Sequence, residues 1–165
     1  MKIIVFVCVV FGLAVGLTSP VSAISEAQKN AIVENCATIR EDLKTLQHND
    51  SRARVYLGRY YETILNRFII PLNMRLVENN LQSDKLTNSQ SDFTKLKNNF
   101  TIDYIEYQKG LEELVGVNCK NEPERFYRKL GVVREKRQVV AEDVAKMQRL
   151  MLAQVSLVEG LKEEI

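Results

Sequence analysis

The sequence predicts an all-α protein: an elongated antiparallel three-helix bundle or coiled coil that follows an N-terminal signal peptide. Two observations support this prediction. After residue 24, apolar residues recur every three or four positions, which is the period of helices that pack side by side. No stretch alternates apolar and polar residues with the period of two that a half-buried strand needs, and no Asn-Gly hairpin turn occurs. A length of 165 residues leaves room for one domain.

Composition and charge exclude several classes of protein. Apolar residues make up 45% of the chain and charged residues 27%, which fits neither a disordered chain nor one embedded in a membrane. The formal net charge of +2 produces no field that would attract nucleic acid. We therefore expect no nucleic-acid partner.

The first 23 residues have the pattern of a secretory signal peptide. Lys2 supplies a positive start, residues 3–17 carry no charge, and Val21-Ser22-Ala23 places small side chains at a cleavage site. As a helix, residues 3–17 would span about 22 Å, less than the ~30 Å hydrocarbon core of a bilayer. We predict cleavage after Ala23, and a single helical-bundle domain over residues 24–165. The alternative is an uncleaved anchor, which would be the only membrane contact.

Two cysteines, Cys36 and Cys119, follow the signal segment. An even number of cysteines in an exported chain favours a disulfide. We predict a Cys36–Cys119 bond that fixes the register of the bundle. The last helix would then start level with Cys36 and end level with the connector near residue 81. The alternative is two free buried thiols.

The first helical segment is predicted to begin at Ser25, which can form a capping box with Gln28. The polar residues 48–51 either separate two helices or lie within one long helix that has Asp50 as a polar seam position. Pro71 predicts a kink or break near Ile70. The apolar seam of this segment contains Ile32, Cys36, Ile39, Leu43, Leu46, Ala53, Leu57, Tyr60 and Ile64.

The second half of the chain is predicted to hold two more helices. Residues 81–90, rich in Ser, Asn, Asp and Thr, predict the one extended connector. The next helix covers about residues 91–115, and Gly116 is expected to end it in the left-handed conformation. After a tight turn at 118–121, Pro123 suits the first turn of a helix that runs nearly to the end. Arg137 lies on the apolar seam of that helix, where a polar residue typically sets the register.

The residues that most catalytic sites need are missing from the sequence. His48 is the only histidine and lies in a polar segment without a neighbouring nucleophile. There is no Glu-x-x-His pair, Gly-rich phosphate loop, nucleophile elbow or Cys-x-x-Cys motif. We expect no enzymatic activity, and no catalytic, cofactor-binding or metal-ligating residues.

Residues 52–62 are the most distinctive segment, because arginines are interleaved with tyrosines there. Both residue types are enriched in interface hot spots, and guanidinium groups stack on phenol rings. The alternative is that Tyr60 belongs to the core seam and the arginines only solvate the outer surface. The predicted interaction face consists of Arg52, Arg54, Tyr56, Arg59 and Tyr61.

Three segments resemble a family of uncharacterised small exported proteins from bacteria with reduced genomes. They are residues 50–62 (DSRARVYLGRYYE), 68–73 (FIIPLN) and 119–127 (CKNEPERFY). The resemblance covers most of the chain after the signal segment. It implies export from a bacterial cell and a helical, coiled-coil-rich body, but it brings no function with it. The glycosylation sequons at Asn49 and Asn99 would then be idle.

These patterns predict an exported, non-enzymatic structural or protein-interaction coiled-coil protein of the cell envelope or surface. It would be extracellular, on the cell surface or periplasmic, with a protein partner or a second copy of itself. One alternative is a periplasmic holdase-type chaperone, which would need an exposed apolar groove. Another is an amphipathic membrane-surface protein, which needs a basic face opposite large apolar residues. The last predicted helix has an apolar stripe, but its charges are mixed.

Overall fold

The computed structural model describes residues 24–81 and 84–164, with side chains up to residue 160. All secondary structure in these residues is helical, so the all-α prediction is confirmed. The predicted signal peptide, residues 1–23, lies outside the described residues. In chain order the elements are α1 (Glu26–Glu34), α2 (Cys36–Ile64), the π-helical turn η1 (Leu65–Ile69), α3 (Ile70–Glu78), α4 (Asp84–Val115) and α5 (Pro123–Glu164).

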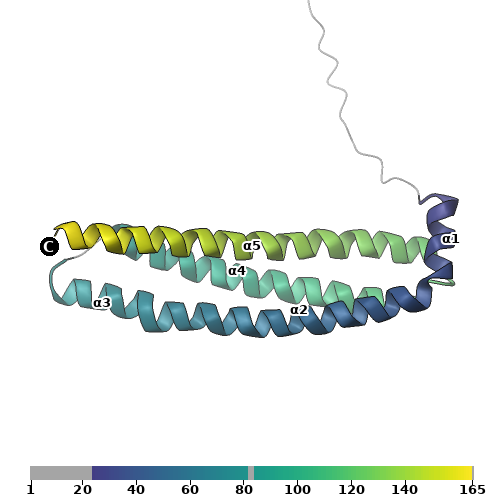
Figure 1. Cartoon of the computed structure of the whole chain (residues 1–165), viewed down its shortest axis with the longest axis horizontal. Coiled ribbons are helices and arrows are strands. Elements are labelled where there is room, and N and C mark those ends of the chain that lie inside the picture. The colour runs from purple at the N-terminus through teal and green to yellow at the C-terminus, as the bar shows by residue number, and fades with distance from the viewer. Residues whose placement is uncertain (1–23, 82–83, 165) are drawn as a thin grey trace, which may run out of the picture.

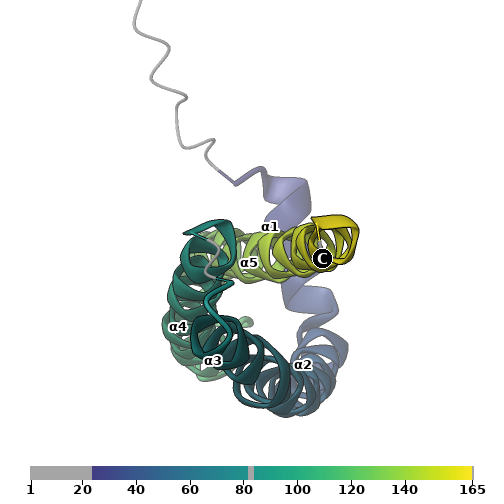
Figure 2. The same ribbon diagram turned by 90° about the vertical axis from the view of Figure 1, so that its left-hand side faces the viewer.

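The helices run back and forth along one long axis. The arm formed by α2, η1 and α3 lies beside α4, and α4 lies beside α5 (Figures 1 and 2). α1 crosses the axis at one end, next to the start of α5 (Figure 1). In the described part of the chain, no Cα atom of α2 lies within 8 Å of a Cα atom of α5, whereas both helices approach α4 that closely. α4 is therefore the central helix, and the molecule has an open side between α2 and α5.

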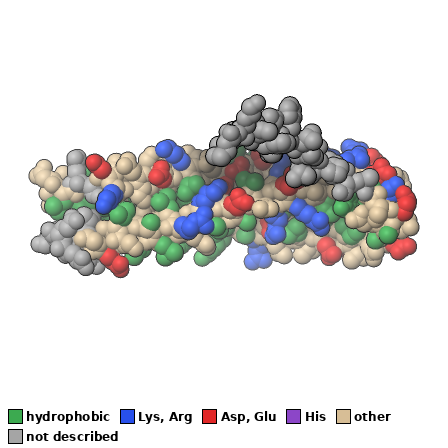
Figure 3. All heavy atoms as spheres, turned by 90° about the horizontal axis from the view of Figure 1, so that it is seen from above, with side chains coloured by type: hydrophobic (Ala, Val, Ile, Leu, Met, Phe, Trp, Pro, Cys, Tyr) green, Lys and Arg blue, Asp and Glu red, His purple; other side chains and the backbone are tan. Residues whose placement is uncertain are grey.

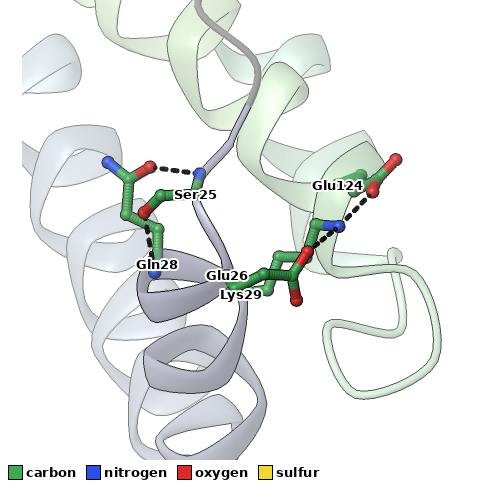
Figure 4. Close-up of polar contacts among 5 residues, drawn as sticks. All are labelled: Ser25, Glu26, Gln28, Lys29 and Glu124. Carbon is green, nitrogen blue, oxygen red and sulfur yellow. Dashed lines mark hydrogen bonds and ion pairs between the residues drawn. The ribbon is translucent and has the colours of Figure 1, made fainter.

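The chain enters α1 through the predicted capping box. The Ser25 hydroxyl accepts a hydrogen bond from the Gln28 backbone N–H at 3.2 Å, and the Gln28 side chain accepts one from the Ser25 N–H at 2.9 Å (Figure 4). Lys29 lies between Glu26 and Glu124, at 2.8 and 2.7 Å, and so connects α1 to the start of α5 (Figure 4). The capping signal in the sequence thus describes the local structure correctly.

The first helix ends earlier than the sequence indicates. α1 stops at Asn35, whose side chain donates a hydrogen bond to the Ala31 carbonyl at 2.8 Å. The polar residues 48–51 continue α2 without a break. Of the two alternatives, one long helix with Asp50 at a polar seam position is therefore the observed one, but its start at Cys36 was not predicted.

The irregularity predicted near Ile70 is a π-helical turn. Pro71 has no N–H to donate to the preceding turn, and it lies in the first turn of α3, where no donor is needed. The wider turn η1 directly precedes α3. The residues buried just before it also differ from the predicted seam. Tyr61 and Leu65, four residues apart, are 1% and 5% exposed, whereas Tyr60 is 44% exposed. The prediction of Tyr60 as a core residue is wrong, and Tyr61 takes that position.

The polar segment 81–90 is not an extended connector, because α4 already begins at Asp84. Leu86 and Phe93, seven residues apart, are both buried. Asn73 of α3 donates hydrogen bonds to the Leu86 carbonyl at 3.3 Å and to the Gln90 side chain at 2.6 Å. Burial and these contacts override the weak helix propensity of the segment.

The end of α4 also differs from the prediction. Gly116 has no positive φ; among the described non-glycine residues only Asn80, after α3, has one, at 56°. The Gly116 N–H bonds to the Glu112 carbonyl at 3.1 Å, and the Val117 N–H bonds to the Leu114 carbonyl at 3.1 Å. The helix therefore ends by tightening its last turn, which needs no left-handed residue.

α5 follows a tight turn, as predicted. The Asn118 side chain accepts hydrogen bonds from the backbone N–H groups of Lys120 and Asn121, at 3.1 and 3.2 Å. α5 then ends close to the connection between α3 and α4 (Figure 1). Its most buried seam residues are spaced by multiples of seven: Phe126, Val133, Met147 and Gln154.

The two cysteines lie at the opposite end of the molecule from that connection. Their Sγ atoms are 1.94 Å apart and their Cα atoms 5.6 Å apart, so the predicted pairing is present. Cys36 and Cys119 belong to a core cluster with Leu111, Leu114 and Phe126. A second cluster fills the other half of the molecule and contains Tyr61, Leu65, Ile69, Phe93, Phe100 and Met147.

Candidate functional site

The predicted interaction face is divided by the fold. Arg54 turns toward the open side of the molecule, where its guanidinium carbon lies 5.3 Å from the centre of the Tyr104 ring. Tyr61 is buried, and its ring meets those of Phe93 and Phe100 edge-on. Including Tyr61 in an exposed face was therefore wrong, because its side chain belongs to the core.

The other members of that face lie together on the outer surface of α2. Tyr56 is 69% exposed, and its ring is stacked on Tyr60, with ring centres 6.4 Å apart. Arg52 and Arg59 form no ion pair with any described residue. Arg52, Tyr56 and Arg59 line a shallow hollow on this surface together with His48. The role of this surface as an interaction face stays a prediction.

Two hollows lie along the open side, with α2 and α5 on either side of them, and together they are called the groove. The central hollow has a volume of about 380 Å³, with α4 as its floor. The aromatic rings of Phe100, Tyr104 and Tyr107 form the floor. The walls are Asp50, Ala53, Arg54 and Leu57 of α2, with Arg134, Arg137, Gln138, Val140 and Ala141 of α5.

One carboxylate joins all three sides of this hollow. The Tyr107 hydroxyl donates a hydrogen bond to Asp50 Oδ2 at 2.7 Å. Arg137 donates from Nε to the same oxygen at 2.9 Å and from Nη2 to Oδ1 at 3.3 Å. Burial, followed by the bond to Asp50, raises the pKa of Tyr107 well above its usual range, so this phenol stays a donor. Asp50 thus connects α2, α4 and α5.

Sequence reasoning identified Asp50 and Arg137 separately but missed their pairing. Each was a polar residue on an otherwise apolar seam, one acidic and one basic. That combination was a usable signal, because such residues often meet across a helix interface.

The central hollow carries excess positive charge. Asp50 is its only acidic residue and is bound by Arg137. Arg54 and Arg134, on opposite walls, form no ion pair within the described residues. The hollow therefore favours negatively charged groups.

The second hollow of the groove, the distal hollow, is more apolar and lies toward the end of α5. Its volume is about 440 Å³, and Glu159 is its only charged lining residue. The buried Gln154 also lines it, and its Nε2 has no hydrogen-bond partner among the described residues. The apolar lining comes from Tyr60, Ile64, Phe68, Ile69, Leu72, Leu86, Met151, Val155 and Val158.

α4 and α5 bring together two carboxyl groups that the sequence did not single out. Asp143 is 2% exposed and lies 3.2 Å from the Lys146 amine. Burial raises the pKa of Asp103, and so do the hydrogen bond that its protonated form donates to Asp143 and the negative charge of Asp143. The charge of Glu106 adds to this rise, and Lys146 opposes it. Nothing in the sequence distinguishes these two acids from others on the helix surfaces, because the pair exists only through the register of α4 against α5.

This pair predicts a pH-dependent effect of Asp103→Asn. A carboxyl group with a raised pKa in the folded state makes folding less favourable as pH rises through that value. Asp103→Asn removes this pH-dependent loss of stability and keeps a hydrogen-bonding group. We expect the variant to melt a few degrees higher than wild type at pH 7, with a smaller difference at pH 4, in calorimetric scans.

The matched control is Asp92→Asn, because Asp92 is an exposed acid on the same helix, paired only with Lys95 at 3.7 Å. It should show no such change between the two pH values. Equal changes of melting temperature in both variants would contradict the raised pKa of Asp103.

Other features constrain the chemistry of the chain. No group of three His, Cys, Asp or Glu side chains in residues 24–81 and 84–160 is arranged to hold a metal ion. None of the described helices combines the length and apolar character needed to cross a bilayer. Comparisons of the chain with family models, curated proteins and solved structures find no match. The site is therefore interpreted from its own geometry.

Proposed function

We propose that this chain is an exported, non-enzymatic interaction protein: an antiparallel three-helix bundle whose open groove receives a helix of a partner protein. One observation carries the proposal. The backbones of α2 and α5 approach α4 but not each other, and two hollows lie between them beside the Asp50–Arg137 ion pair. A helix laid along the groove would contact both walls, which is a common mode of recognition.

Exposed apolar side chains support this role for the groove. Phe68 and Val155 line the distal hollow from opposite walls and are 65% and 55% exposed. Contiguous exposed apolar patches in soluble proteins commonly mark interaction sites. An occupant would remove both side chains from water.

Export is a second part of the proposal. It is supported by the signal-peptide pattern of residues 1–23 and by a cysteine pair at disulfide distance, which fits an oxidising compartment. The resemblance to small exported bacterial proteins agrees with it.

The charge pattern does not favour the membrane-surface alternative. Acidic and basic side chains are interspersed among hydrophobic ones on the face seen in Figure 3. Binding to a lipid surface works best with a basic polar face. The holdase alternative shares the exposed groove, but it requires binding to unfolded chains in general, so an aggregation-suppression assay separates it from binding to a defined partner.

Filling the groove tests the proposed function. Ala53 and Ala141 line opposite walls of the central hollow and are exposed. We expect Ala53→Trp with Ala141→Trp to leave the helical circular dichroism signal and melting temperature nearly unchanged, since neither side chain is buried. Proteins that cross-link to the wild-type chain at the cell envelope should be lost from this variant.

Two variants serve as controls for that experiment. Ala153→Trp adds the same bulk at an exposed position of α5 outside both hollows and should keep the wild-type partners. Arg52→Ala with Arg59→Ala alters the outer surface of α2. Loss of partners in this second variant, with retention in the groove-filled one, would move the interaction to the outer surface and overturn the groove as the binding site.

A further inference from the structure

We infer that the helix received by the groove is acidic where it lies in the central hollow and uncharged where it lies in the distal hollow. This inference rests on the proposed function and adds the chemistry and the position of the partner. It follows from the unequal distribution of charge along the groove.

The central hollow offers two arginines that form no ion pair with any described residue. Arg54 is held against the Tyr104 ring, which limits the conformational freedom that binding would otherwise remove. Arg134 faces it from α5, and the nearby Asp50 is already bound by Arg137 and Tyr107. A carboxylate placed between the two walls would meet two unpaired guanidinium groups and no free acid.

The distal hollow has the opposite preference. Its lining is apolar apart from Asn73, Gln154 and Glu159. Asn73 is already hydrogen-bonded to α4, and Glu159 would repel a second acid. The Gln154 amide lacks a partner in the structure, so this hollow suits apolar side chains with at most an uncharged polar group.

The extent of the groove favours a helix over a short ligand. The residues of α5 that line the two hollows extend from Arg134 to Glu159. At a rise of 1.5 Å per residue this corresponds to about 38 Å, so a helix of about 24 residues fits along it. A partner helix can therefore place acidic residues at one end of the groove and an apolar stripe at the other.

Two synthetic helical peptides of about 24 residues test the inference. Both carry the same stripe of leucines; one has two glutamates beside the stripe at one end, and the other has lysines at these positions. Each is titrated calorimetrically into the purified protein with its disulfide intact. We expect the glutamate peptide to bind about tenfold more tightly, because two attractive pairs replace two repulsive ones.

Reversing the charge of the groove should reverse this preference. Arg54→Glu with Arg134→Glu should bind the lysine peptide more tightly than the glutamate peptide. Arg52→Glu with Arg59→Glu makes the same charge change on the outer surface of α2 and should leave the wild-type preference intact.

The outcomes separate this inference from the proposed function. Equal binding of both peptides, abolished by Ala53→Trp with Ala141→Trp, would overturn the acidic partner and leave the groove as a binding site. No binding of either peptide would overturn the inference. If the groove-filled variant then also keeps its cross-linked partners, the proposed function fails with it.

Discussion

Replacing Cys36 and Cys119 together by alanine should lower the free energy of unfolding by about 4–5 kcal/mol. The bond joins residues separated by 83 positions, so it removes much of the conformational freedom of the unfolded chain. Both residues are buried, at 4% and 0% exposure, and alanine keeps the site apolar. A loss of this size is a large share of the 5–15 kcal/mol that stabilises a typical domain.

Urea denaturation of the two proteins measures this effect. The slope of the unfolding free energy against urea should also rise in the variant, because its unfolded chain expands further. Wild-type protein unfolded in the presence of a reducing agent is the matched control and should lose the same stability. A double variant as stable as untreated wild type, or two free thiols in a non-reducing peptide map, would contradict the bond in the exported protein.

Tyr61→Ala should lower the free energy of unfolding by about 3–5 kcal/mol, as expected for truncating a buried aromatic side chain. Tyr61 is 1% exposed and packs against Phe93 and Phe100 in the core of the distal half. Tyr61→Phe should be neutral or slightly stabilising, since the hydroxyl is buried without a hydrogen-bond partner among the described residues. Both effects are measured by thermal or urea unfolding.

Tyr56→Ala provides the comparison on the same helix. Tyr56 is 69% exposed, so this change should alter stability by no more than about 0.5 kcal/mol. If Tyr61→Ala instead folds as stably as wild type but loses a partner, Tyr61 would belong to a binding face, as the sequence suggested. The pair of tyrosines thus distinguishes a core residue from a surface one within a single segment.

Several features of this protein follow from the sequence because they depend on local interactions or on the length of the chain. The capping box at Ser25 involves residues three positions apart, and Pro123 suits a first turn wherever that helix packs. The apolar period of the last segment predicts α5 along nearly its whole length. The pairing of Cys36 with Cys119 also placed the end of α5 near the connection between α3 and α4.

The remaining features depend on contacts between segments that are distant in the chain. The polar composition of residues 81–90 predicts an extended connector, but burial of Leu86 and the hydrogen bonds from Asn73 accompany a start of α4 at Asp84. Packing against Phe93 and Phe100 of α4 places Tyr61, and not Tyr60, in the core. The heptad pattern of one helix does not specify which of these two neighbouring positions faces α4.

Sequence periodicity therefore determined that this protein is helical and where most of the helical segments lie. Only the tertiary structure decided that the backbones of α2 and α5 come closer to α4 than to each other, which leaves the hollows of the groove between them. It also decided that Arg54 faces this groove while Arg52 and Arg59 face outward, and that Asp103 meets Asp143. Hydrogen bonds within a helix form between near neighbours in the chain, whereas these contacts change when one helix turns or slides by a single residue against the next.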